Sequence, residues 1–159
     1  MNLKDKALNG EIDDKKIEEA VKLLMGGGTV RQARGFTRDQ METMYSVAYN
    51  LYATRQLEKA DTVFRYLTYL DHTNAKYWIG LGAVQQLRRD FAHAVASYGY
   101  AAFLDLKNAK PLYHVAECYL ALGDSEKAES ALTAMKEYSD ASSPYQARAQ
   151  KLAERIKAA

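Results

Sequence analysis

The sequence predicts an all-α fold, a solenoid of repeated helix pairs with one further helix at each end. Apolar residues recur at the i, i+3, i+4 and i+7 spacing of amphipathic helices, and the alternation typical of strands is absent. Only two prolines, at 111 and 144, interrupt a chain that is rich in helix-forming residues. The stretch 47–74 also aligns without gaps on the stretch 81–108, and such self-similarity indicates a repeat protein.

The composition limits the partners and the compartment of the chain. Its 159 residues can bury a sizeable core without disulfides or metals. The 22 basic and 20 acidic residues are scattered, which argues against nucleic acid as a partner. The chain has one cysteine, Cys118, and no apolar run of about 18 residues. We therefore expect a cytoplasmic protein that does not insert into a membrane.

The first predicted helix spans residues 13–25, and three glycines at 26–28 end it. One side of this helix is apolar and needs a partner. That partner is either the repeats themselves or a second copy of the protein, and we favour the homodimer. The segment 1–36 is therefore a candidate dimerisation segment, with an interface formed by Ile17, Ala20, Val21 and Leu24.

The remaining residues, 37–159, contain three copies of a helix pair. The offset between copies is 34 residues, because Ala60, Ala94 and Ala128 coincide in the alignment. A period of 34 with small and aromatic residues at fixed phases resembles the tetratricopeptide repeat, a pair of antiparallel helices. The proline that usually closes each repeat is missing. The predicted repeats cover about residues 41–74, 75–108 and 109–142.

Local signals mark the starts of these helices. Thr37 and Gln40 make a capping box before the first helix of repeat one. Asn74 and Asn108 are suitable N-caps for the corresponding helices of repeats two and three. A last helix, about 144–157, begins with a proline that a first helical turn tolerates, and it caps the stack.

Small and large side chains divide the packing between these helices. We expect Gly82 and Ala94 where the two helices of a pair approach closely, whereas Tyr98 fills the space between pairs. The first helix of repeat one carries an aliphatic stripe that we expect to pack on neighbouring helices, formed by Met44, Val47, Ala48 and Leu51.

A second stripe on the same helix consists of Tyr45, Tyr49 and Tyr52, which fall within roughly 60° of one another. The first helices of such repeats line the concave side of a solenoid. Tyrosine suits peptide recognition because it combines a large rigid ring with a hydroxyl group. The positions in phase with it complete a predicted peptide-binding groove: Ile79, Ala83, Gln86, Tyr113 and Glu117. Alternatively, the amino-terminal helix covers the tyrosines and makes them part of the core.

No arrangement typical of a catalytic or metal site is present. The stretch "HVAEC" places His114, Glu117 and Cys118 close together on a helix, but a second histidine one turn away is lacking. The stretches "GLG" at 80–82 and "GGGT" at 26–29 do not follow a predicted strand, so neither is expected to bind phosphate. We expect no enzyme, no metal and no cofactor.

The chain contains "GGGT", "MYSVAYNLY", "YLDH", "GLGAVQQL" and "HVAECYLALGDSEKAESAL" in this order. Together these motifs, which cover nearly the whole chain, resemble the class II chaperones of bacterial type III secretion that hold translocator proteins. The resemblance implies a protein of the bacterial cytoplasm that is often dimeric and binds hydrophobic translocators before export. It also implies that Tyr45, Tyr49 and Tyr52 receive an extended segment of the client, and that His72 lies near the edge of the groove.

The alternative function is that of a generic tetratricopeptide adaptor for another peptide or protein. An adaptor for acidic carboxyl termini needs a clamp of Lys, Arg and Asn. Lys76 and Lys110 suit a weaker version of that clamp, but the tyrosines of repeat one argue against it.

Overall fold

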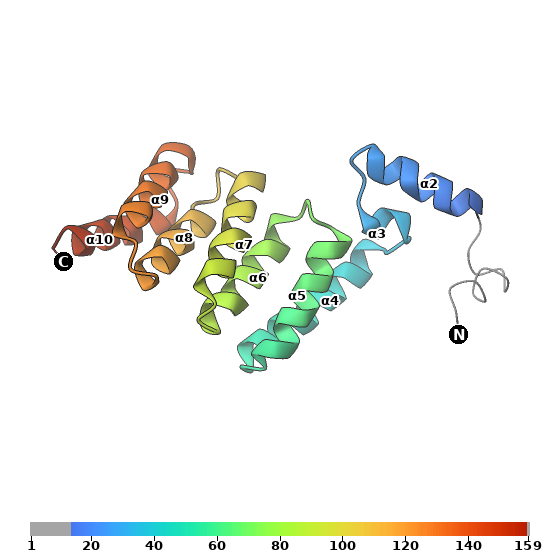
Figure 1. Ribbon diagram of the computed structural model, residues 1–159, viewed down its shortest axis with the longest axis horizontal. Helices are drawn as coiled ribbons and strands as arrows, with labels where there is room; N and C mark the ends of the chain where they lie inside the picture. The colour runs from blue at the N-terminus through green and yellow to red at the C-terminus, as the bar shows by residue number, and fades with distance from the viewer. Residues whose placement is uncertain (1–13, 159) are drawn as a thin grey trace.

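The computed structural model describes residues 14–158, in which nine helices and no strand occur (Figure 1). The predicted all-α fold is confirmed, while residue 13, the expected start of the first helix, lies outside the described residues. The helices are α2 (Asp14–Met25), α3 (Val30–Ala33), α4 (Arg38–Ala53), α5 (Leu57–Leu70), α6 (Ala75–Leu87), α7 (Phe91–Leu104), α8 (Ala109–Ala121), α9 (Ser125–Tyr138) and α10 (Pro144–Ala158).

Three successive helix pairs, α4 with α5, α6 with α7 and α8 with α9, stack along the long axis of the molecule (Figure 1). Thr37 and Gln40 form the expected capping box at the start of α4, each side chain bonding the backbone N–H of the other residue. The side chains of Asn74 and Asn108 cap α6 and α8. The predicted helix starts are therefore confirmed at all three pairs.

The apolar interior forms two clusters along the stack. One joins α4, α5 and α6 around Phe64 and Tyr77, and the other joins α7 to α10 around Tyr98 and Met135. The aliphatic stripe of α4 packs as predicted through Ala48, but the prediction for Val47 is wrong. The Val47 side chain is 48% exposed, because α4 is the first helix of the stack and no earlier repeat covers its outer side.

The predicted close approach within a helix pair occurs at Gly82. A Cβ atom added there would lie 2.9 Å from the Tyr98 ring, and Ala94 is fully buried. The Tyr98 ring also stacks on His114 of α8, so it fills the space between pairs as expected. A second close approach, at Gly80, was not predicted: an added Cβ atom would lie 2.1 Å from the Phe64 ring.

The glycines after α2 lead into a short helix that the sequence reasoning missed. Gly27 has φ +84°, which ends α2, and α3 then begins with a capping box between Thr29 and Gln32. The Arg31 guanidinium forms an ion pair of 3.4 Å with Asp71, which follows α5. The segment between α2 and α4 therefore carries a helix that packs against the repeats.

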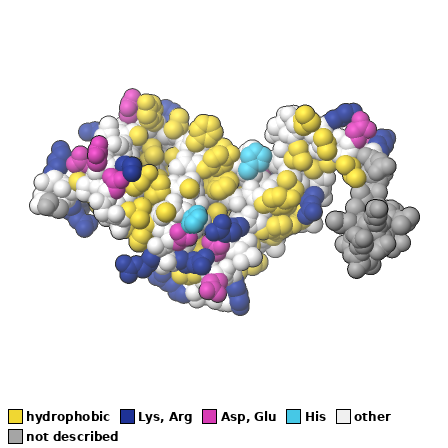
Figure 2. Space-filling model, in the orientation of Figure 1, with side chains coloured by type: hydrophobic (Ala, Val, Ile, Leu, Met, Phe, Trp, Pro, Cys, Tyr) yellow, Lys and Arg dark blue, Asp and Glu magenta, His cyan; other side chains and the backbone are white. Residues whose placement is uncertain are grey.

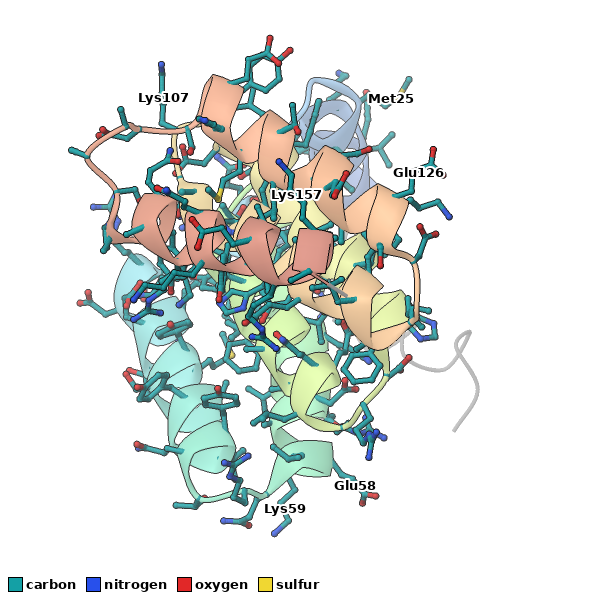
Figure 3. The ribbon with its side chains drawn as sticks, turned by 90° about the vertical axis from the view of Figure 1, so that its left-hand side faces the viewer. Met25, Glu58, Lys59, Lys107, Glu126 and Lys157 are labelled. Carbon is teal, nitrogen blue, oxygen red and sulfur yellow. The ribbon has the colours of Figure 1, made fainter. Side chains whose placement is uncertain are left out.

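The last helix, α10, caps the stack as predicted. Ala149 and Leu152 are buried in the second cluster, and Tyr145 and Ile156 pack against it. A hollow of about 770 Å³ remains between α9 and α10, with Glu129, Lys136, Glu154 and Lys157 among its charged lining residues. Figure 3, in which Lys157 is labelled, shows α10 crossing the end of the molecule.

The helix α2 stands apart from the repeats. It packs mainly against α3, and the two helices lie at the opposite end of the molecule from α10 (Figure 1). Its apolar side chains are uncovered, with 46% of Ile17, 48% of Val21 and 42% of Leu24 exposed. Within the described residues, no helix is both long enough and apolar enough to cross a membrane.

Hydrophobic side chains also gather on the face seen in Figure 2, over α5 and α7. The large exposed residues of these two helices are Tyr66, Tyr69 and Phe103. They belong to the second helix of each pair, whereas the predicted groove belongs to the first. The two surfaces are therefore distinct.

Candidate binding groove

The first helices of the three pairs, α4, α6 and α8, carry the predicted groove residues at equivalent positions. Tyr45, Ile79 and Tyr113 are one period of 34 residues apart, and so are Tyr49, Ala83 and Glu117. Side chains of neighbouring repeats meet across these helices: Tyr45 and Ile79 line one hollow, and Gln86 bonds Glu117. The structure thus places these residues on one surface. Their role in binding stays a prediction.

The three tyrosines of α4 form a continuous aromatic stripe. Ring centroids are 6.4 Å apart for Tyr45 and Tyr49, and 6.2 Å apart for Tyr49 and Tyr52. Tyr45 is supported from below, since its ring lies 5.9 Å from Phe64 and 6.0 Å from Tyr77. In contrast, Tyr49 is 53% exposed. The alternative that the amino-terminal helix covers the stripe does not hold in the single chain, where α2 packs against α3.

A hollow of about 440 Å³ opens at one end of the stripe. Lys76 lies at its wall, with its ammonium 3.8 Å from the centre of the Tyr45 ring and 3.0 Å from a Glu42 carboxylate oxygen. Burial raises the pKa of the Tyr45 hydroxyl, although Lys76 opposes this effect, so the phenol stays neutral near pH 7. The lining residues are Tyr45, Asn74, Ala75, Lys76, Ile79, Asp105, Asn108 and Lys110.

The middle of the groove contains a connected set of polar groups. The hydroxyl of Tyr98 donates to Gln86 Oε1 at 3.0 Å, and Gln86 Nε2 donates to Glu117 Oε2 at 3.2 Å. The same Glu117 oxygen lies 2.8 Å from His114 Nδ1. Burial raises the pKa of the Glu117 carboxyl, but the hydrogen bonds from His114 and Gln86 outweigh this effect, and the pKa lies below its usual value. Glu117 is therefore ionised at neutral pH.

Aromatic rings from α8 and α10 close the other end of the groove. The ring of Tyr145 lies 5.3 Å from Tyr113 and 5.9 Å from His114, and the Arg148 guanidinium lies 5.1 Å from the centre of the Tyr145 ring. Sequence reasoning assigned Tyr145 only to the cap. Because it stands 32 residues after Tyr113 and not 34, the repeat period did not place it in the groove.

His72 stands apart from the groove stripe. It lies in the loop between α5 and α6, where its carbonyl oxygen accepts a hydrogen bond of 2.9 Å from Trp78 Nε1. The Trp78 ring packs against Tyr100 of α7, at 4.7 Å. Among the described residues, the imidazole of His72 joins none of the ring contacts of the tyrosine stripe. Its place at the groove edge stays a prediction.

The "HVAEC" residues have structural explanations. Cys118 is fully buried, and burial raises the pKa of its thiol to about 12, so it is not a reactive thiolate. His114 and Glu117 take part in the hydrogen-bond network described above. No group of three or more His, Cys, Asp or Glu residues suited to a metal ion occurs in the part of the chain that the structure describes.

Comparison with known proteins identifies the family. Residues 41–74 match the tetratricopeptide repeat family model. The SycD chaperone of Yersinia enterocolitica, solved in complex with a peptide of the translocator YopD, is 35% identical and superimposes with a TM-score of 0.71 over 76% of this chain and 95% of SycD. The chain belongs to the family of type III secretion translocator chaperones. The family resemblance described above is therefore confirmed.

Two further proteins are similar to this chain. A T3SS complex from Aeromonas hydrophila contains a chain that is 32% identical, with a TM-score of 0.82 over 89% of this chain and 96% of the other. The low calcium response locus protein H of Yersinia pestis is 38% identical over 109 residues, or 69% of this chain. The match spans 65% of that relative, slightly less than two thirds of its length. A second structure of SycD is described as an alternative dimer.

Proposed function

We propose that this protein is a cytoplasmic chaperone that binds an extended segment of hydrophobic type III secretion translocators. The segment lies in the groove of α4, α6 and α8, and its binding keeps the client soluble until export. The observation that carries this proposal is the tyrosine stripe of α4, in which Tyr49 is 53% exposed and Tyr45 packs on Phe64 and Tyr77. The SycD complex with a YopD peptide supports it.

The composition of the groove suits this task. Hydrophobic segments that later enter a membrane aggregate when they are exposed in water, so a chaperone must cover them. Tyrosine rings offer large apolar contact area, and their hydroxyl groups remain available to the polar backbone of an extended peptide. Binding of this kind holds the client by mass action and needs no catalytic group or cofactor. We therefore propose a binding function and no enzymatic activity.

We also propose that the free protein is a homodimer through α2. This helix exposes an apolar side on which Ile17, Val21 and Leu24 are each more than two-fifths exposed, with Ala20 between them. Covering such a side against a second copy removes it from water. The structure of SycD as an alternative dimer supports self-association in the family.

The experiment that tests the groove is a client pulldown with Tyr49→Ala. Tyr49 is the right position because Tyr45 also supports the core, so a loss of binding in Tyr45→Ala would mix folding with recognition. Truncation of an aromatic anchor typically weakens binding by about 2 kcal/mol, which is roughly thirtyfold. The thermal midpoint of Tyr49→Ala should stay within about 2 °C of the wild type, since the ring is half exposed.

The matched control for this experiment is Tyr138→Ala. Tyr138 is 48% exposed and lies at the end of α9, outside the groove. Tyr138→Ala should retain the client, whereas Tyr49→Ala should lose it. Equal recovery of hydrophobic secreted proteins with both variants would contradict the proposed binding site.

A further inference from the structure

One position on the groove surface carries a charge, in contrast to its counterparts in the other repeats. Glu117 on α8 is in phase with Ala83 on α6 and with Tyr49 on α4. Its side chain is one-third exposed, so it borders the groove and not the interior. Among the described residues, no lysine or arginine forms an ion pair with Glu117, and the nearest partner of opposite character is His114, whose Nδ1 lies 2.8 Å from the carboxylate.

The hydrogen-bond network holds the Glu117 carboxylate in place and leaves it able to accept one more donor. Gln86 and His114 both donate hydrogen bonds to Oε2 of this carboxylate. Two carboxylate oxygens offer about four acceptor sites in total. The Gln86 amide is itself oriented by Tyr98, which occupies its oxygen and leaves its NH₂ group to face Glu117.

The rings around this carboxylate are suited to a cation. Tyr113 and Tyr145 lie within 5.9 Å of the His114 ring, and His114 Nδ1 lies 2.8 Å from the Glu117 carboxylate. Arg148 already places its guanidinium over Tyr145, which shows that this aromatic surface accepts a cationic group. Aromatic faces next to a carboxylate are the usual surroundings of a bound ammonium or guanidinium.

The electrostatics of a covered groove favour the same ligand. A segment that lies over α8 removes water from the exposed part of the Glu117 carboxylate. Covering that charge with purely apolar groups is costly, because a buried carboxylate needs a compensating charge or donor. A segment that brings a cationic side chain to this point removes that cost.

We propose that Glu117 binds a lysine or arginine side chain of the client segment, so that the groove recognises an apolar part on α4 together with a cation on α8. This inference rests on the proposed function. It defines the clients as those whose chaperone-binding segment combines large apolar residues with a basic residue at a fixed distance. It also gives Glu117 a role in specificity that the tyrosines do not have.

Selection from a library of random linear peptides displayed on phage tests this inference with the full-length protein. Parallel selections use the wild type, Glu117→Gln, and Glu58→Gln as a control. Glu58 is an exposed carboxylate in the first turn of α5, labelled in Figure 3. Peptides selected on the wild type and on Glu58→Gln should carry lysine or arginine at a fixed spacing from their apolar residues. Peptides selected on Glu117→Gln should lack this enrichment. The same basic enrichment with all three proteins overturns the inference.

One selected peptide is then synthesised with its lysine and with norleucine in that position, a change that keeps the apolar stem and removes the charge. The norleucine peptide should bind the wild type at least about tenfold more weakly than the lysine peptide does. On Glu117→Gln, the affinities of the two peptides should differ by less than about twofold. Equal losses on both proteins contradict the inference. If Glu117→Gln does not fold, the salt dependence of peptide binding to the wild type provides the test. The affinity of the lysine peptide should fall steeply with ionic strength, whereas that of the norleucine peptide should not. An equal fall for both peptides overturns the inference.

The selection also separates the two claims. Peptides whose binding requires Tyr49 but shows no preference for a basic residue leave the proposed function intact and overturn only the role of Glu117. If the selected peptides bind Tyr49→Ala and the wild type equally well, both the proposed function and the role of Glu117 are overturned. The same holds if no peptide is enriched.

Discussion

Two glycines inside helices of this protein differ in their surroundings, which makes their substitution by alanine informative. Gly80 in α6 faces the buried ring of Phe64, and an added Cβ atom would lie 2.1 Å from it. At Gly99 in α7, no atom lies within 4 Å of the same added Cβ atom, apart from the adjoining residues and the backbone of its own helix. Both substitutions should gain about 0.5–1 kcal/mol of helix propensity. Only Gly80→Ala must also displace a packed ring.

The magnitude follows from these two contributions. Forcing a methyl group into a filled core costs about 1–3 kcal/mol, and Phe64 has little freedom to move because it is 1% exposed and packs edge-on against Tyr45. Since the propensity gain is common to both variants, the difference between them isolates the clash at about 2 kcal/mol. For a chain of this size that corresponds to thermal midpoints about 4–8 °C apart.

Thermal unfolding followed by circular dichroism measures this difference directly. Gly99→Ala should unfold at or above the wild-type midpoint, and Gly80→Ala below it. Equal midpoints for the two variants would refute the claim that the approach of α5 and α6 at Gly80 excludes a side chain.

Three further predictions concern other parts of the molecule. Cys118 should resist a thiol reagent in the folded protein and react fully in denaturant, because it is buried and its pKa is raised; fast labelling of the native protein would contradict its placement. At pH 7 the free energy of unfolding should be larger for the wild type than for Glu117→Gln, because the pKa of the Glu117 carboxyl is lowered in the folded state. This difference should be lost as the pH falls below 4.5 and the carboxylate becomes protonated. A constant difference down to pH 3 would contradict this assignment. Val21→Glu should convert the dimer to a monomer, as measured by sedimentation, because it places a charge on the apolar side of α2. Lys22→Glu, a change at an exposed position of the same helix, should leave the dimer intact. An unchanged mass for Val21→Glu would contradict an interface at α2.

The repeat period accounts for most of what the sequence predicted correctly. It places Tyr45, Ile79 and Tyr113 at equivalent points on three helices, and the structure shows them on the expected helices. Capping residues such as Asn108 fixed the helix starts, because an N-cap satisfies backbone N–H groups locally and does not depend on the rest of the fold.

The features that were missed depend on contacts between distant residues or fall outside the period. Tyr145 enters the groove from the capping helix, out of phase with the repeats. The four residues of α3 are too few to show helical periodicity, although Thr29 and Gln32 form a capping box that could have revealed it. Val47 was wrongly expected to pack, because the period alone does not say that α4 is the first helix of the stack. The division between segment 1–36 and the repeat domain stays a prediction.

Site-specific photo-crosslinking in living cells can show whether the client segment lies on the tyrosine stripe. A photoreactive phenylalanine analogue replaces Tyr49 in the groove or Tyr138 outside it, and mass spectrometry identifies the crosslinked peptides under conditions that permit secretion. We expect position 49 to crosslink to one short segment of a hydrophobic secreted protein, and position 138 not to do so. Crosslinks from position 49 only to folded cytoplasmic proteins, or the same client segment at both positions, would contradict it.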